Sequence, residues 1–253
     1  MARKLVVANQ KGGVGKTTVA VNLGAALVER GRRVLLLDLD PQAGLTASLG
    51  IDPYAERRGM YALLTQQEVT PPQVTLHAAD GLAVIPASLD LAALESRLGT
   101  GQSAVFRLRG ALERAESPFD YVIIDTPPSL GILTANALIA ADAVLITVQA
   151  QYLAMRGVRT LLDTIGHVRT RLNPALALAG VLVTMYRPES LHAREALDEI
   201  RAVFPRETFR TVIPDSEAVI EAPVAGISVL AYAPGDPAAQ AYRALAEEIM
   251  AHE

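Results

Sequence analysis

The 253-residue chain has no cysteine and no tryptophan, and aromatic residues make up only 4% of it. Without cysteine it forms neither disulfides nor thiolate metal sites, so proteins that carry cysteine-bound clusters are excluded. With so few aromatics, the core must be built from Leu, Val, Ile and Ala. That composition suits a parallel sheet covered by helices.

An excess of positive charge and long apolar runs are missing too. The 23 basic and 27 acidic residues give a net charge of −4, which shows no overall sign of a nucleic-acid binder. No apolar stretch approaches the roughly 20 residues that cross a bilayer, and the run after Lys4 is too short for a signal peptide. We therefore expect a soluble, cytoplasmic protein. Hydrophobic residues make up 51% of the chain, enough for a sizeable core.

The most informative stretch, residues 9–18, reads NQKGGVGKTT. It follows the apolar run 5–8 and precedes the apolar-periodic segment 19–28, an order that predicts a strand, a glycine-rich turn and a helix. Such a turn presents backbone N–H groups to a phosphate chain at the positive end of a helix dipole, and its glycines let the backbone close around the phosphates. Lys16 would reach the β- and γ-phosphates, and the Thr17 hydroxyl suits Mg²⁺. The predicted cradle comprises Gly12, Gly13, Val14, Gly15, Lys16, Thr17 and Thr18.

Two further apolar runs end in aspartates. Residues 33–37 lead to Asp38 and Asp40, and residues 119–124 lead to Asp125. Because ligands of doubly wound sheets bind at the carboxyl ends of the strands, these acids should lie near the nucleotide. Asp125 fits the carboxylate that supports Mg²⁺ opposite the phosphate loop. Read alone, Asp38 and Asp40 could equally be solvated acids at a strand end.

Strand-like and helix-like segments alternate along the rest of the chain. We expect strands at 82–86, 143–148, 179–186 and 209–214, and helices at 17–30, 89–98, 103–115, 152–172, 190–204 and 237–252. A short helix is expected within 54–67, and Pro71 and Pro72 indicate a loop. This pattern predicts an α/β fold, a doubly wound, mainly parallel sheet with helices on both faces, in a single domain spanning residues 1–253.

The phosphate loop departs from the general pattern, in which a glycine would stand at Gln10 and no second lysine precedes the glycine pair. KGGVGKTT resembles the deviant Walker A motif of the ParA/MinD family of ATPases. Together with LDLDPQ at 37–42 and IIDTPPS at 123–129, it makes nearly the whole chain similar to the short, Soj-like ParA partition ATPases. LNP at 172–174, VLVTMY at 181–186 and TVIP at 211–214 give weaker support.

The resemblance implies roles for particular residues. ATP and Mg²⁺ would be the cofactors, and Lys11, Lys16 and Asp40 the catalytic residues. Lys11 would reach the nucleotide of the other subunit, so hydrolysis would need an ATP-bound homodimer. Asp40 would position or activate the attacking water, while the metal would be supported by Thr17, Asp38 and Asp125. Met185, Pro214 and Ser216 would lie beside the nucleotide, the last two near the adenine.

The family also implies partners: non-specific double-stranded DNA, and a ParB-like protein that stimulates hydrolysis and thereby segregates a chromosome or plasmid. The protein would then be associated with the nucleoid. Where relatives read VIPRN, however, this chain has Asp215 and Ser216, and Ile227 replaces a later lysine. Lost cations weaken DNA binding at that surface. Compensating candidates are Arg187, Arg194, Arg206 and Arg210, with Arg201, Arg156 and Arg159 as further ones, unless these arginines are ordinary solvated charges.

Two alternatives remain at this stage. A ParA-like ATPase that positions a protein cargo has the same sequence signals. A MinD-like ATPase at a membrane surface needs a basic amphipathic C-terminal helix, but residues 242–253 are acidic and poor in bulky apolar side chains. We therefore expect no membrane partner.

Overall fold

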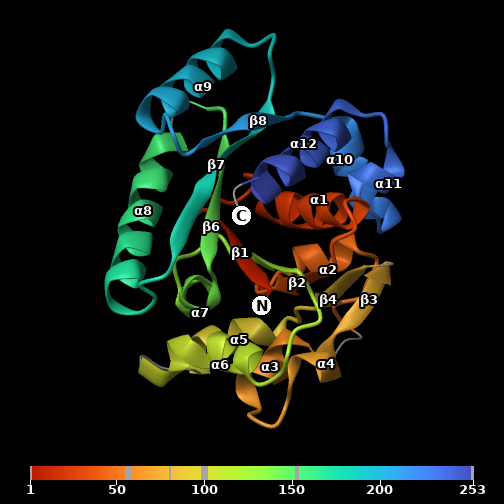
Figure 1. Ribbon diagram of the computed structural model, residues 1–253, viewed down its shortest axis with the longest axis vertical. Helices are drawn as coiled ribbons and strands as arrows, with labels where there is room; N and C mark the ends of the chain where they lie inside the picture. The colour runs from red at the N-terminus through yellow and green to blue at the C-terminus, as the bar shows by residue number, and fades with distance from the viewer. Residues whose placement is uncertain (1, 55–58, 80, 98–101, 152–153, 252–253) are drawn as a thin grey trace.

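The computed structural model describes residues 2–54, 59–79, 81–97, 102–151 and 154–251. An eight-stranded sheet in the order β3-β4-β2-β5-β1-β6-β7-β8 forms its centre (Figure 1). All neighbouring strands are parallel except β3 and β4. The strands are β1 (Arg3–Ala8), β2 (Val34–Asp38), β3 (Leu76–Ala79), β4 (Leu82–Ile85), β5 (Tyr121–Asp125), β6 (Ala143–Gln149), β7 (Ala177–Tyr186) and β8 (Thr208–Pro214). The predicted mainly parallel α/β sheet is confirmed.

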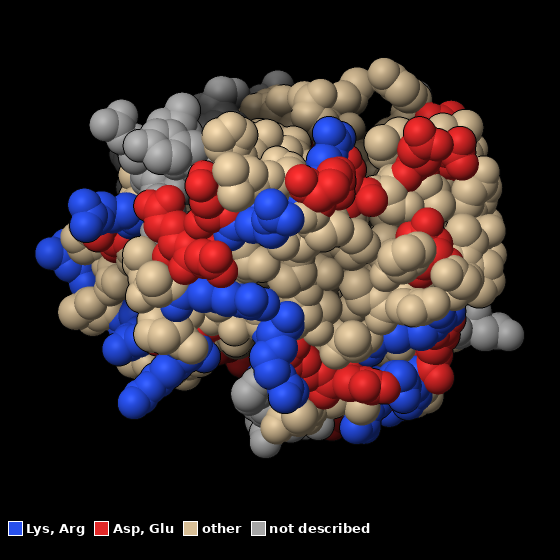
Figure 2. Space-filling model, turned by 90° about the horizontal axis from the view of Figure 1, so that it is seen from above, with Lys and Arg blue, Asp and Glu red and all other residues tan. Residues whose placement is uncertain are grey.

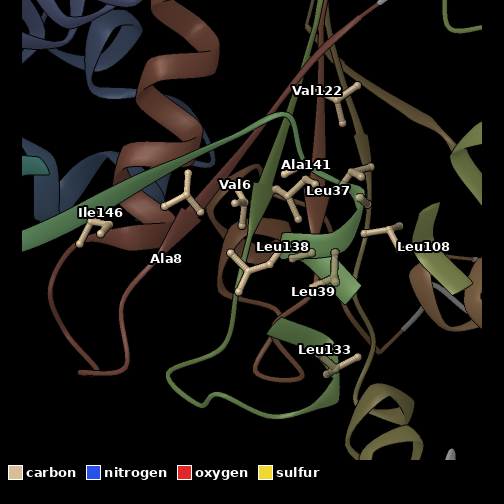
Figure 3. Close-up of a cluster of buried hydrophobic side chains, with 14 of the residues drawn as sticks. Val6, Ala8, Leu37, Leu39, Leu108, Val122, Leu133, Leu138, Ala141 and Ile146 are labelled. Atoms are coloured by element: carbon tan, nitrogen blue, oxygen red, sulfur yellow. The ribbon is translucent and has the colours of Figure 1, made fainter. Parts of the chain in front are cut away.

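Helices cover both faces of this sheet, and the alternation of side chains along the strands divides the core into two layers. In β1, Leu5 and Val7 belong to the layer under α1 (Lys16–Glu29) and α12 (Pro237–Ala251), whereas Val6 and Ala8 belong to the opposite layer. Figure 3 shows this second layer, in which side chains of β1, β2 and β6 meet Leu133 and Leu138. The core is mainly aliphatic, as the composition predicts, although Tyr121, Tyr242 and Phe209 are also buried in it, and the sheet divides it in two, as period-2 strands require.

The remaining helices are short except for two. They are α2 (Gly44–Ser48), α3 (Met60–Thr65), α4 (Pro71–Val74), α5 (Asp90–Arg97), α6 (Arg107–Glu113), α7 (Ile132–Ala140), α8 (Ala154–Arg171), α9 (Leu191–Val203), α10 (Glu217–Glu221) and α11 (Val229–Tyr232), with 3₁₀ helices η1 (Gln102–Phe106) and η2 (Ala222–Ala225). No helix in the described part of the chain is long and apolar enough to cross a membrane.

Some local predictions are wrong. Pro71 and Pro72 do not form a loop but begin α4, because the first helical turn needs no N–H from those positions. The helix expected at 103–115 starts as the 3₁₀ turn η1. The helix expected within 54–67 is α3, and residues 55–58 of that range lie outside the described residues.

The edge strand β8 carries an irregularity that the last helix satisfies. The register between β7 and β8 shifts between the Val181 and Val183 pairings, so the backbone around residue 210 leaves the regular ladder. The Glu248 carboxylate, on α12, accepts hydrogen bonds from the backbone N–H groups of Arg210 (2.8 Å) and Thr211 (3.1 Å). Burial raises the pKa of Glu248, but these hydrogen bonds outweigh it, so its pKa is lowered.

Candidate nucleotide site

The phosphate loop connects the central strand β1 to the N-terminus of α1, as predicted. Gly13 (φ 72°) and Gly15 (φ 80°) adopt left-handed conformations that side chains disfavour. The loop is fastened from β7, which lies two strands from β1, because the Thr184 hydroxyl donates a 3.0 Å hydrogen bond to the Val14 carbonyl. No side chain caps α1 at Gly15, and its first turn carries no acidic residue. The free N–H groups of the first turn are thus available to an anion.

Lys16 opens α1 and is nearly buried, with 7% of its surface exposed. Its ammonium donates to the Lys11 carbonyl oxygen at 3.3 Å. Burial lowers the pKa of Lys16, while the charges of Asp125 and Asp40 act in the opposite direction. The cation is therefore held inside the loop, close to both predicted carboxylates, where phosphate oxygens would supply the missing negative charge.

Thr17 and Asp125 form the second half of the site. The Thr17 hydroxyl donates a 2.6 Å hydrogen bond to Asp125 Oδ2 at the carboxyl ends of the central strands. Asp125 is fully buried, and within the described residues its Oδ1 has no hydrogen-bond partner. Burial, followed by the charge of Asp38, raises the pKa of Asp125 to about 8. A buried carboxylate oxygen of this kind requires a counter-charge.

These residues fit a magnesium ion. Mg²⁺ is normally held by one or two carboxylates, a hydroxyl and nucleotide phosphates rather than by a closed protein cage. Thr17 and Asp125 supply a hydroxyl and a buried carboxylate oxygen side by side at the carboxyl ends of the central strands. Consistently, the residues that the structure describes contain no group of three or more His, Cys, Asp or Glu side chains arranged to hold a metal alone.

Asp38 ends β2 and is fully buried, but its carboxylate is already occupied. Oδ2 accepts hydrogen bonds from the backbone N–H (2.9 Å) and the hydroxyl (2.6 Å) of Thr46, and Oδ1 accepts from the Asp40 N–H at 3.1 Å. Burial raises the pKa of Asp38 to about 6, although the Thr46 hydrogen bonds oppose the shift. Asp38 therefore orders the loop after β2, and sequence reasoning missed its partner Thr46.

Asp40 is half-buried and lies in the same loop, two residues after Asp38. Its Oδ1 accepts the Gln42 N–H at 2.9 Å, and its carbonyl oxygen accepts the Ala43 N–H at 2.8 Å. Ala43 has a positive φ of 53°, a strained conformation for a non-glycine residue. A Cβ on the next residue, Gly44, would lie 3.6 Å from the Thr17 methyl group. The Asp40 loop is thus folded directly against the phosphate loop.

Lys11 behaves differently from Lys16. Its side chain is exposed, and its ammonium donates a 3.0 Å hydrogen bond to the Gln151 side-chain oxygen beyond the end of β6. Its backbone N–H is held by the Asn9 side chain, which in turn donates to the Thr147 carbonyl on β6. The backbone of Lys11 is therefore fixed, while its exposed ammonium is bonded to Gln151 and, unlike that of Lys16, not to the phosphate loop. Asn9 belongs to the stretch that the sequence singles out, but its role of holding the Lys11 backbone was not predicted.

The residues expected beside the nucleotide base lie at one end of the sheet. A Cβ at Gly15 would lie 3.8 Å from the Met185 methyl group, and Met185 itself has a positive φ of 52°. Pro214 and Ser216 line an open pocket of about 550 Å³ with Tyr186. The Ser216 hydroxyl donates a 2.9 Å hydrogen bond to Asp236, which also lines that pocket.

The four arginines proposed for DNA do not gather in one place. Arg187 follows β7 at its carboxyl end and is paired with Asp215 at 2.5 Å. Arg194 begins α9 at the same end and donates to the Pro188 carbonyl at 3.2 Å. Arg206 precedes β8, so it lies at the amino-terminal ends of the strands, about 20 Å from the end where Arg187 lies. Arg210 lies along β8 itself. Figure 2, in which the molecule is seen from above relative to Figure 1, shows basic and acidic side chains interleaved, not one uninterrupted basic surface.

Comparisons with known proteins find relatives along the whole chain. A protein-family model described as an AAA domain matches residues 2–178. The chromosome-partitioning ATPase Soj of Thermus thermophilus is 46% identical over 249 residues, covering 98% of this chain and 96% of Soj. The chromosome partitioning protein ParA of Caulobacter vibrioides is 43% identical over 253 residues, covering 99% and 95%. The structure of cobyrinic acid a,c-diamide synthase from Mycobacterium smegmatis, with bound ADP and magnesium, has a TM-score of 0.87 at 39% identity and covers 100% and 95%.

Proposed function

The chain belongs to the ParA/MinD family of ATPases, with Soj and ParA partition proteins among its relatives, and we propose that it is a partition ATPase switched by dimerisation. Its cofactors are ATP and Mg²⁺. ATP binding drives two copies together with the nucleotides sandwiched between them. The dimer binds duplex DNA without sequence preference, and a ParB-like partner stimulates hydrolysis, which releases the dimer and moves a chromosomal or plasmid cargo along the nucleoid.

The contrast between the two loop lysines carries this proposal. Lys16 is buried and aimed into its own loop, whereas Lys11 is exposed and its ammonium is held by Gln151. A lysine anchored by its backbone, with a side chain leading outward, suits a charge that is delivered to the nucleotide of a facing subunit. Phosphoryl transfer depends mainly on positioning and charge neutralisation, so a cation that arrives only on dimerisation makes hydrolysis conditional on it.

Each chain would contribute the rest of the site. Magnesium, when bound, neutralises charge on the β- and γ-phosphates. Thr17 and Asp125 would hold it, and Asp38 would support it indirectly by ordering the loop that carries Asp40. Asp40, half-buried beside Lys16, would orient the attacking water. Met185, Pro214 and Ser216 would line the base. The sheet takes strands from residues 3–214, and α12 packs on β8, which supports a single-domain unit.

DNA contact is the part of the proposal that needs its own experiment. Arg187 and Arg194 lie at the nucleotide end of the sheet and could face one DNA duplex in the dimer. A gel shift of random-sequence duplex with ATP, with ADP and without nucleotide tests this. ATP-dependent retention that weakens steeply with salt is expected, because released counterions drive binding. No shift with ATP at low salt would remove DNA from the proposal and leave the protein-cargo alternative.

A further inference from the structure

An exposed apolar surface lies on α10, η2 and α11, the elements that follow Pro214 and Ser216 in the chain. Ile220 is 70% exposed, Val224 91%, Ile227 40% and Tyr232 42%. We refer to these four side chains as the 220–232 patch. In Figure 1 they belong to the blue elements beside α12. Single exposed apolar residues are ordinary on protein surfaces, but four within thirteen consecutive residues are not scattered.

The four side chains belong to one surface. α10 runs directly into η2 with helical backbone at Glu221 and Ala222, so Ile220 and Val224 stand about one turn apart on the same side. The Tyr232 hydroxyl donates a 3.1 Å hydrogen bond to Glu221, which brings α11 against α10. The Ile227 N–H donates to the Ala222 carbonyl at 3.3 Å.

The segment is firmly attached, so the exposure of the patch does not come from a loose loop. Ala222, Val229 and Leu230 are buried in the core on its inner side, and the Val229 N–H donates a 2.8 Å hydrogen bond to Asn22 of α1. Gly226 has a φ of 72°, and a Cβ there would lie 3.0 Å from the Gly50 Cα. The apolar side chains therefore point outward from a rigid base.

The segment between Arg210 and Arg243 carries only negative charges, and Arg243, which donates to the Pro234 carbonyl, is itself paired with Glu29. Residues 211–242 contain no Lys or Arg and four acids, Asp215, Glu217, Glu221 and Asp236. Their net charge is 0 − 4 = −4, equal to 23 − 27 = −4 for the whole chain, so the remaining residues sum to zero. Asp215 is paired with Arg187, and Asp236 holds Ser216 and the N–H of Ala238. Glu217 and Glu221, on α10 itself, are the acids closest to the apolar side chains.

We propose that the 220–232 patch docks a basic amphipathic segment of a protein partner. Apolar side chains one helical turn apart would cover Ile220 and Val224, and flanking Lys or Arg would meet Glu217 and Glu221. DNA is disfavoured because its phosphates would face carboxylates with no basic residue in the segment. A second copy is disfavoured because the same patch on both partners would bring two acidic surfaces together, with four carboxylates from Glu217 and Glu221 in one interface.

The proposal is tested by selecting peptides from a displayed random library. The peptides are about 16 residues long, enough to span a helix-in-groove contact. The target is the full chain, with counter-selection against Val224→Asp. Enriched peptides should be basic, with apolar residues at i and i+4. A synthesised winner, labelled and followed by fluorescence anisotropy, should bind Val224→Asp about 10-fold or more weakly and Glu217→Lys about 3-fold more weakly. Leu191→Asp, at a site on α9 that is 58% exposed, is the matched control and should bind as the wild type does.

Three outcomes overturn the proposal. Enrichment of neutral or acidic peptides, or equal binding to Val224→Asp, removes the basic segment as the occupant. Loss of DNA retention in Val224→Asp but not in Leu191→Asp assigns the surface to DNA instead. A change of sedimenting mass in Val224→Asp without nucleotide assigns it to a second copy. Circular dichroism of each variant, and ATP binding of Val224→Asp and Leu191→Asp, unchanged from wild type, exclude misfolding as the cause.

Discussion

The buried ammonium of Lys16 donates to the carbonyl oxygen of Lys11 at 3.3 Å, while the Lys11 side chain leaves the loop for Gln151. One lysine thus lies inside the cradle and rests on the backbone of the other. This contact ties the position of the outward lysine to the loop that holds the phosphates. The two lysines, five residues apart in the sequence, therefore have different contacts: Lys16 lies within the phosphate loop and Lys11 bonds Gln151.

Lys16→Ala should weaken ATP binding by about 100-fold, because a buried ammonium aimed into the loop is lost. Isothermal titration with a non-hydrolysable ATP analogue and Mg²⁺ measures the affinity. Lys4→Ala is the matched control: Lys4 pairs with Asp142 away from the loop and should leave affinity unchanged. Unaltered affinity in Lys16→Ala would show that the phosphates bind elsewhere.

Asp40→Ala should retain ATP affinity but lose hydrolysis by about 10²- to 10⁴-fold, the usual contribution of a positioned acid–base group. Steady-state phosphate release, with the stimulating partner where available, gives the rate. Asp163→Ala, at an exposed acid on α8, serves as the control. Turnover of Asp40→Ala within a few-fold of wild type would exclude Asp40 from water activation.

The strand, loop and helix of the nucleotide site are predictable from sequence because local signals agree there. Apolar runs of strand length end at Ala8, Asp38 and Asp125, and glycines mark the loop. Helix α7 is not predicted, because residues 132–140 are nearly all apolar and a helix buried on most sides has no polar face to produce a 3.6-residue period. Strand β3 is likewise missed, because the strand is short and most of its residues are exposed.

The supporting contacts of the site are beyond sequence reasoning. Thr46 is eight residues from Asp38, and the contact exists only because α2 folds back on β2. Thr184 reaches Val14 across 170 residues through strand pairing that no local pattern specifies. The same holds for Arg187. Its position in the sequence suggests a free cation, but the fold brings it to Asp215, just after β8, and the two form an ion pair.

Asp215→Asn should strengthen DNA binding, because it releases the Arg187 guanidinium from its ion pair. We expect one added phosphate contact per chain, two per dimer, which steepens the slope of log affinity against log salt by about 1.8 for the dimer. Anisotropy of labelled duplex across a salt series with an ATP analogue measures it. In the Asp215→Asn background, adding Arg187→Ala should return the slope to the wild-type value, and adding Arg206→Ala, at the opposite end of β8, should not. Equal losses in these two variants would contradict the assignment.

Glu248→Gln should destabilise the protein by about 1–3 kcal/mol at neutral pH, since an amide offers one acceptor oxygen to two backbone N–H groups of β8. The lowered pKa of Glu248 sets the pH dependence. Its contribution is present above the model-peptide value of 4.5 and is lost as pH falls through the lower folded value. The stability difference from wild type should therefore narrow in acid, once the pH has fallen below 4.5.

Urea unfolding near neutral pH and in acid measures this difference. Glu247→Gln is the control, because Glu247 pairs with Arg30 on the surface and should matter by less than about 1 kcal/mol. A Glu248→Gln effect that is the same at both pH values would mean that the carboxylate charge does not hold the β8 amides.

Sedimentation velocity of wild type and Lys11→Ala, each saturated with a non-hydrolysable ATP analogue and Mg²⁺, tests the dimer switch most directly. Wild type should sediment as a dimer with the analogue and as a smaller species with ADP. Lys11→Ala should bind the analogue with an affinity within a few-fold of wild type, because its ammonium is not directed at its own loop, yet remain unassociated. A Lys11→Ala protein that dimerises and hydrolyses ATP like the wild type would contradict a charge delivered between subunits.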